Sequence, residues 1–225
     1  MGISIPAGGG VLVRTGVERA VLVRRTYAIV FVSVLVTIGG AALGLTQPAL
    51  MGVVARHPFL TFLLVLAPLF LALRMRKVFP ANLGLTFLFT LAEGVWIAPL
   101  LLAYERSMPG VVGQAAVLTA GTFGVLTVYA FLSRRDFSAW GSFLSVGVWV
   151  LLGTMLLNLF FKNPAAHLWI SAVGLLIFSG LVIYDTWKIR NVYGPDDYVE
   201  AAVNIYLDIL NIFLFLLSLL GGRRD

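Results

Sequence analysis

Seven long apolar stretches follow one another along the chain, separated by prolines and charged residues. A helix needs about 20 consecutive apolar residues to cross the hydrocarbon core of a bilayer. By that measure the sequence predicts seven transmembrane helices, the second of which is the shortest, over residues 27–45, 59–73, 83–104, 111–132, 143–161, 168–189 and 198–220. The short connections predict that most consecutive helices are antiparallel neighbours. The fold class predicted is an all-α integral membrane protein.

Composition supports this interpretation. Of the 225 residues, 60% are hydrophobic and 12% are charged, whereas a soluble domain is near half apolar and about a quarter charged. A soluble globular enzyme, a disordered chain and a disulfide-stapled secreted domain are therefore excluded. With no cysteine and only two histidines, thiolate metal sites and a histidine-rich metal cage are disfavoured. The lipid bilayer is the expected partner.

The charges are placed at the edges of the apolar stretches. A net charge of +6 without a basic stripe interleaved with aromatics disfavours nucleic acid as a partner. Eleven Lys and Arg residues lie on one side of the predicted membrane and five on the other if the N-terminus is inside. The positive-inside rule then predicts a cytoplasmic N-terminus and a C-terminus outside. The expected organisation is a cytoplasmic arm over 1–24, a transmembrane domain over 25–221 and a tail over 222–225.

A single polar stripe runs along the last predicted helix. Its four members recur at helical spacing and share one face: Glu200, Asn204, Asp208 and Asn211. A carboxylate in hydrocarbon costs roughly 2.5–3.5 kcal/mol, so we expect this helix to be central in the bundle. The alternative is a polar seam that only joins helices.

Asp185 lies about one turn inside the cytoplasmic end of the sixth predicted helix. Because a short connection follows, Asp185 and Asp208 can lie at similar depth on neighbouring helices. Two carboxyl groups in one apolar site would share a proton and titrate as a coupled unit, which suits a pH sensor or a labile Ca²⁺ site with oxygen ligands. The alternative for Asp185 is an interfacial carboxylate paired with Lys188, one turn along.

Two further residues are candidates on the basis of their positions. Arg74 ends the second predicted helix on the cytoplasmic side, and we hypothesise that it latches Asp185 when that aspartate is ionised. The simpler reading of Arg74 is a positive-inside arginine that snorkels to the interface. Glu93, midway along the third predicted helix, would attract a cation in a pathway, or else be a protonated acid bonded to a neighbouring helix.

Two runs of small residues, 39–42 and 121–124, predict surfaces where helices pack closely. We assign no chemistry to them.

The sequence resembles the Bax inhibitor-1 (transmembrane Bax-inhibitor-motif) family in its prokaryotic form. The specific matches are SGLVIYDTWKI over 179–189 and EAAVNIYLDILNIF over 200–213, and weaker ones are RMRK over 74–77 and SRRDFS over 133–138. The resemblance implies six helices around the last one and a pH-sensitive calcium leak. It also implies that Asp185 and Asp208 act as the sensor and that Arg74 pairs with one of them.

The predicted function is a pH-sensitive calcium leak channel in the bacterial inner membrane, with Ca²⁺ and protons as partners and no cofactor. It is not expected to be an enzyme. One alternative is a proton-coupled transporter or a helix-bundle scaffold without transport. Another is an intramembrane aspartyl protease, which Tyr184–Asp185 fits, but Tyr206-Leu207-Asp208 departs from the expected Gly-x-Gly-Asp.

Overall fold

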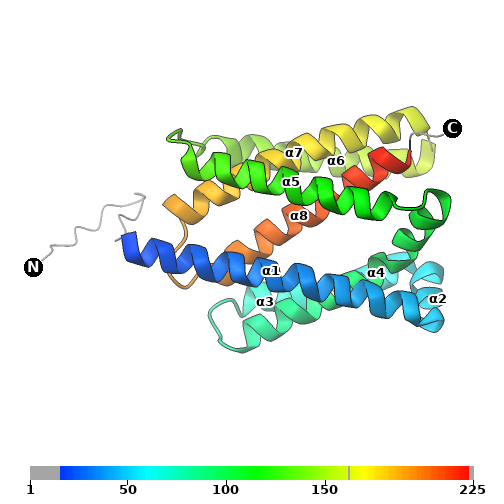
Figure 1. Ribbon diagram of the computed structural model, residues 1–225, viewed down its shortest axis with the longest axis horizontal. Helices are drawn as coiled ribbons and strands as arrows, with labels where there is room; N and C mark the ends of the chain where they lie inside the picture. The colour runs from blue at the N-terminus through cyan, green and yellow to red at the C-terminus, as the bar shows by residue number, and fades with distance from the viewer. Residues whose placement is uncertain (1–15, 162, 223–225) are drawn as a thin grey trace, which may run out of the picture.

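The computed structural model describes residues 16–161 and 163–222, and in them the chain folds into helices (Figure 1). Their bounds are α1 Gly16–Thr46, α2 Pro48–Arg56, α3 Pro58–Arg74, α4 Ala81–Ser107, α5 Val111–Leu132, α6 Trp140–Phe161, α7 Pro164–Asn191 and α8 Tyr198–Gly221. Most of the predicted arm, residues 1–15, and residues 223–225 of the predicted tail lie outside the described residues. The predicted boundary at residue 24 falls inside α1, which already buries Leu22.

Six helices in the described part are long and apolar enough to cross a membrane: α1, α4, α5, α6, α7 and α8. This confirms a multi-span helical membrane protein. The second predicted span corresponds to α3, which has only 17 residues and meets α2 at a bend of 106°. A seventh crossing is obtained by counting α2 and α3 as one bent span.

The bend between α2 and α3 has a local cause. Pro48 and Pro58 each stand at the start of a helix. Proline is tolerated there because the first backbone N–H groups of a helix have no acceptor within the helix. His57 ends α2 outside the helical region of backbone space and at the same time precedes α3. Helix α2 falls in the segment that Pro48, His57 and Pro58 were expected to make a gap between the first two predicted spans.

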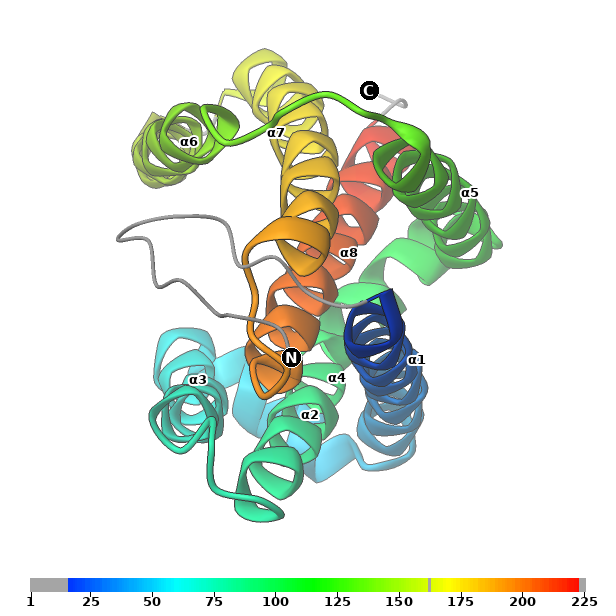
Figure 2. The ribbon, with the colours of Figure 1, turned by 90° about the vertical axis from the view of Figure 1, so that its left-hand side faces the viewer.

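Helix α8 lies in the middle of the bundle (Figure 2). Its most apolar window is 50% buried inside the protein, against 11% for α6. Helix α7 packs most extensively on α8, α1 and α5 pack on it less and α4 least, while α3 packs mainly on α4 and α6 on α7. The central position of the last helix is confirmed. The expectation of six helices around it holds only in part, because four make the main contacts.

The helices divide into two halves that follow the chain. The first half comprises α1 to α4 and the second α5 to α8, and the halves meet chiefly where α1 packs on α8. Within the first half α1 and α4 approach very closely, since a Cβ on Gly94 would overlap the Thr37 carbonyl and one on Gly40 would overlap the Leu91 carbonyl. The small residues predicted around 39–42 therefore do allow close packing at Gly40. Gly121 and Gly124 do not, because a Cβ on either would meet no neighbour within 4 Å.

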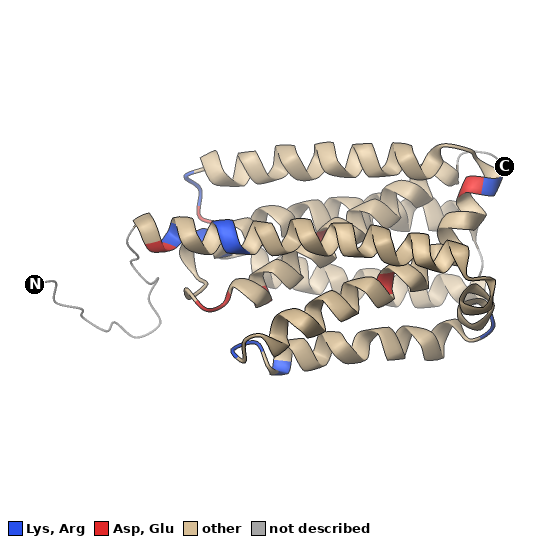
Figure 3. Ribbon diagram, turned by 60° about the horizontal axis from the view of Figure 1, so that its bottom comes forward, with Lys and Arg blue, Asp and Glu red and all other residues tan. Residues whose placement is uncertain are grey.

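The two ends of the bundle differ in charge. The start of α1 and the α3–α4, α5–α6 and α7–α8 connections lie at one end, and the end of α8 lies at the other (Figures 1 and 3). The first end carries Arg24 and Arg25, Arg76 and Lys77, and Arg134 and Arg135. The segments predicted to share the cytoplasmic side therefore lie at the same end.

Candidate functional site

Asp185 and Asp208 meet where α7 packs against α8. Asp185 is 6% exposed and Asp208 is 4% exposed, and their carboxyl groups lie within hydrogen-bonding contact of each other. The structure therefore brings these two aspartates together, and their role as a sensor stays a prediction. Asp185 lies on α7 and Asp208 on α8, and the packing of these two helices on each other helps to exclude solvent from the pair.

The donors available to this aspartate pair are few. Lys188 donates from Nζ to Oδ1 of Asp185 at 3.1 Å. Oδ2 of Asp208 is buried and receives no N–H or O–H hydrogen bond from any described group of the protein. A buried carboxylate oxygen without a donor is costly. A proton on either carboxyl group would allow the two groups to form a hydrogen bond with each other.

Lys188 is held by two aromatic rings. Its Nζ lies 4.6 Å from the centre of the Tyr193 ring and 5.5 Å from that of Tyr184, both within the range of a cation–π interaction. The Tyr193 hydroxyl accepts a 2.7 Å hydrogen bond from Nδ2 of Asn204. Burial raises the pKa of Tyr193, in the α7–α8 connection, to about 12, so this hydroxyl remains neutral. The lysine is thereby fixed beside Asp185.

The polar face of α8 is shared among different partners. Glu200 forms an ion pair with Arg76 of the α3–α4 connection. Asn204 contacts Tyr193 as described above, and Asn211 donates from Nδ2 to its own helix at Leu207 O, 2.8 Å away. Only Asp208 among the four meets a second acidic group. Three residues of the stripe therefore make structural contacts, and only the contact of Asp208 with Asp185 involves two acidic groups whose charge can change with pH.

Arg74 does not contact the aspartate pair. It is exposed at the end of α3, and within residues 16–161 and 163–222 it forms no ion pair. Lys188 is instead the cation on Asp185, which was the alternative reading of that residue. The contact between Arg74 and Asp185 remains a prediction for the state in which both aspartates are ionised. Arg76, two residues beyond Arg74, does reach α8 through its ion pair with Glu200.

Glu93 belongs to a different part of the interior. It is 5% exposed on α4 and lies near Tyr206 of α8, whose hydroxyl is hydrogen-bonded to Thr37 Oγ1 at 2.7 Å. No described N–H or O–H group donates to its carboxyl group. The structure therefore does not bring Glu93 together with Asp185 and Asp208.

The possible calcium site at the aspartate pair has two acidic residues and no third. In the described part of the chain no group of three His, Cys, Asp or Glu side chains could hold a metal ion. Ca²⁺ takes six to eight oxygen ligands, roughly speaking, so this arrangement fits a proton better than a resident Ca²⁺.

Sequence reasoning missed the role of Tyr193. The available signal was weak. Gly194 and Pro195 after Tyr193 predict a turn, but they do not predict that the Tyr193 ring lies against Lys188. The turn itself is fixed by Asp197, whose Oδ2 accepts from Gly194 N at 2.7 Å.

Comparisons with known proteins identify relatives over most of the chain. Residues 19–225 match the family described as inhibitor of apoptosis-promoting Bax1. Protein lifeguard 4 of Mus musculus is 36% identical over 205 residues, which are 90% of this chain and 85% of the relative. The Golgi anti-apoptotic protein of Vaccinia virus is 35% identical, with 90% and 85% covered, and an uncharacterized protein of Campylobacter jejuni is 34% identical, with 90% and 89% covered. The chain therefore belongs to the Bax inhibitor-1 family of membrane proteins, which has bacterial members.

Proposed function

We propose that this protein is a pH-sensitive calcium leak channel of the bacterial inner membrane, with the N-terminus in the cytoplasm. The observation that carries the proposal is the buried contact between Asp185 and Asp208. The bacterial relative from Campylobacter jejuni supports the assignment to a bacterial membrane. In this proposal Ca²⁺ is the permeant ion and the shared proton is the signal.

The pair is suited to sense protons because its charge changes in a low-dielectric interior. With one proton shared, the two carboxyl groups attract each other. Without it, two negative charges in contact repel strongly. Lys188 at 3.1 Å from Asp185 offsets one of these charges, so a second cation is needed when both aspartates are ionised.

Arg74 would supply that second charge. When the pair loses its proton, we propose that Arg74 is drawn from the end of α3 toward Asp185 and holds the bundle closed. Acidification restores the proton, releases the arginine and lets α8 shift against its neighbours. Ca²⁺ flux is then expected to rise as the pH falls, and Glu93 offers the entering cation a second carboxylate.

The direct test measures Ca²⁺ entry into proteoliposomes, with a dye inside, over a series of pH values. Asp185→Asn and Asp208→Asn each remove the shared proton site and are expected to abolish the pH response. Asp136→Asn, an exposed acidic residue in the α5–α6 connection, is the control and should respond like the unaltered protein. If both interior variants keep the normal flux and pH response, the sensor proposal fails.

The latch is tested separately with Arg74 at the end of α3 and Lys77 in the connection that follows it. Arg74→Gln is expected to leave the leak active at high pH, because nothing then holds the ionised pair. Lys77→Gln removes an equal charge three residues away and should retain the normal pH profile. Equal behaviour of the two variants would exclude a specific role for Arg74.

A third measurement distinguishes a leak from coupled transport. A leak moves Ca²⁺ only down its own gradient. Accumulation of Ca²⁺ against its gradient when a proton gradient is imposed would identify a proton-coupled transporter and contradict the proposal.

A further inference from the structure

A large cavity opens between α1 and α5. Its volume is about 720 Å³, with α4 forming one wall and α8 the floor. Both α1 and α5 pack on α8, but their backbones do not pack against one another, and α8 is seen between them in Figure 1. We refer to this cavity as the α1–α5 groove.

The groove has an apolar lining with no free polar group. Its polar members are hydroxyls that already have partners in the protein. Thr37 Oγ1 donates to Ser33 O and is bonded to Tyr206, and Thr119 Oγ1 donates to Ala115 O. A cation or a water molecule would find no ligand there. The occupant must therefore be apolar.

The mouth of the groove faces the membrane. Its rim on α1 is formed by Phe31, Ile38 and Leu45, which are spaced seven residues apart and are all exposed. The lining on α1 runs from Tyr27 to Leu45, about 27 Å at 1.5 Å per residue, close to the roughly 30 Å of a bilayer's hydrocarbon core. The molecules that meet this opening in a membrane are the acyl chains of lipids.

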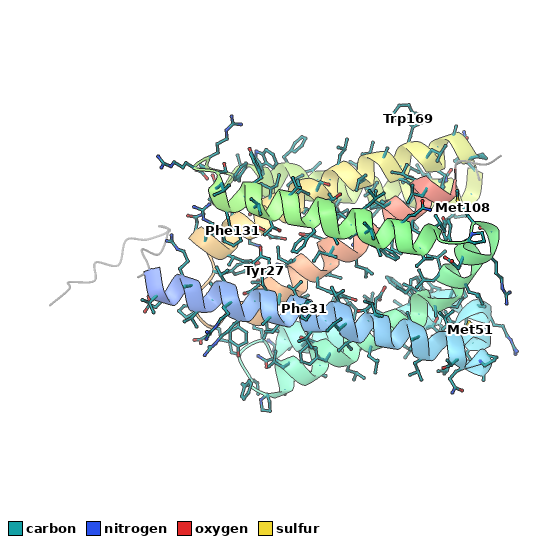
Figure 4. The ribbon with its side chains drawn as sticks, viewed as in Figure 1. Tyr27, Phe31, Met51, Met108, Phe131 and Trp169 are labelled. Carbon is teal, nitrogen blue, oxygen red and sulfur yellow. The ribbon has the colours of Figure 1, made fainter. Side chains whose placement is uncertain are left out.

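One end of the groove is closed by aromatic rings and followed by positive charge. Tyr27 of α1 packs against Phe123 and Phe131 of α5, with ring centres 6.2 and 5.9 Å apart, and Figure 4 labels Tyr27 and Phe131 at this end. Arg24 lies one turn before Tyr27, and Arg134 follows α5. Both arginines are exposed and form no ion pair with other described residues.

That arrangement complements a phospholipid with a negative headgroup. Basic residues at the membrane surface attract anionic lipids. Apart from the buried aspartate pair, the described acidic residues at this end of the bundle are outnumbered two to one by the Lys and Arg residues there: Glu18, Asp136, Asp196, Asp197 and Glu200 against Arg19, Arg24, Arg25, Arg74, Arg76, Lys77, Arg134, Arg135, Lys188 and Arg190. We propose that the α1–α5 groove binds one acyl chain of an anionic phospholipid, whose phosphate lies between Arg24 and Arg134.

Photo-crosslinking tests the acyl-chain site. The full-length protein is reconstituted with phosphatidylglycerol that carries a diazirine in one acyl chain, and labelled residues are located by mass spectrometry after irradiation. Labelling is expected on the floor and wall of the groove at Leu210 and Ile97, which are only 9% and 3% exposed. Lipid that remains outside the groove cannot label these residues. Labelling confined to exposed positions such as Trp149 on α6 would overturn the proposal.

Two neighbouring residues of α5 provide matched variants. Ala116 lines the groove, whereas Val117 is 73% exposed and does not. Ala116→Phe is expected to reduce labelling of Leu210 several-fold, and Val117→Phe is expected to leave it unchanged. Equal labelling in both variants would mean that the chain does not occupy the groove.

The headgroup is tested by competition. Unlabelled phosphatidylglycerol should displace the probe better than phosphatidylcholine, and the combined Arg24→Gln and Arg134→Gln changes should remove that difference. If the two lipids compete equally in the unaltered protein, the anionic headgroup site is excluded. Crosslinks between two protein copies through α1 or α5, with an unlabelled floor, would show that protein covers the groove instead.

Discussion

Lys188 lies one helical turn beyond Asp185 on α7, and its Nζ donates to Oδ1 of the aspartate at 3.1 Å. The lysine's position is set from outside α7 by Tyr193, which lies in the connection to α8. The charge of the aspartate pair is therefore balanced by a residue that the α7–α8 connection holds in place.

Removing this lysine should change the pH at which the leak responds. In Lys188→Met the pair loses its neighbouring positive charge and keeps its proton to higher pH. The midpoint of the Ca²⁺ flux profile is expected to move upward by roughly one pH unit. Lys77→Met, which removes an exposed lysine at the same end, should leave the midpoint in place, and a downward shift in Lys188→Met would contradict the argument.

Tyr193 should act through its ring and not through ionisation. Since its pKa is about 12, its hydroxyl gains no charge between about pH 5 and pH 9. Tyr193→Phe keeps the ring over Lys188 and should preserve the flux midpoint, with a loss of about 1 kcal/mol of stability from the bond to Asn204. Tyr193→Leu removes the ring and should shift the midpoint. Identical flux profiles for the Phe and Leu variants would exclude the ring as a positioning group.

Arg190 should stabilise the end of α5. Its guanidinium donates to the carbonyls of Ala130 and Ser133 at 2.7 and 3.1 Å. Arg190→Ala leaves those acceptors unpaired and should cost about 1–3 kcal/mol, measured by thermal unfolding in detergent. Arg134→Ala, which removes an exposed charge nearby, should unfold close to the original temperature. An unchanged Arg190→Ala midpoint would show that water replaces the guanidinium.

The α1–α4 contact predicts opposite effects for two glycines of one helix. Gly94→Ala would place a methyl group on the Thr37 carbonyl of α1, so about 1–3 kcal/mol of stability should be lost. At Gly84 a Cβ meets nothing within 4 Å, and alanine there should stabilise α4 by roughly 0.5–1 kcal/mol. Thermal unfolding of both variants tests the contact, and two changes of the same sign would argue against it.

Sequence reasoning reached the fold through the long apolar stretches, and it reached the site through Asp208. The spacing of polar residues on α8 predicted a central helix, because a carboxylate needs partners inside a membrane. The short connection between the last two predicted helices indicated that Asp185 could lie near Asp208.

Other features depended on contacts between distant parts of the chain. Nothing local distinguishes Gly40, which packs against α4, from Gly121, where an added Cβ would meet no neighbour within 4 Å. The choice between Arg74 and Lys188 as the cation on Asp185 was equally open, because both lie on the expected side of the membrane. The groove could not be predicted either, since a gap between helices leaves no mark in the hydropathy of those helices.

The division of the bundle into two halves bears on how protonation of the aspartate pair could affect the rest of the molecule. Asp185, Asp208 and Lys188 all belong to the half formed by α5 to α8, whereas Arg74 ends a helix of the other half. Titration of the pair alone would change charges only within the second half of the bundle. If Arg74 moved to the ionised pair, it would form a contact between the two halves. The protonation state of the pair would then control how the halves are held together along α8.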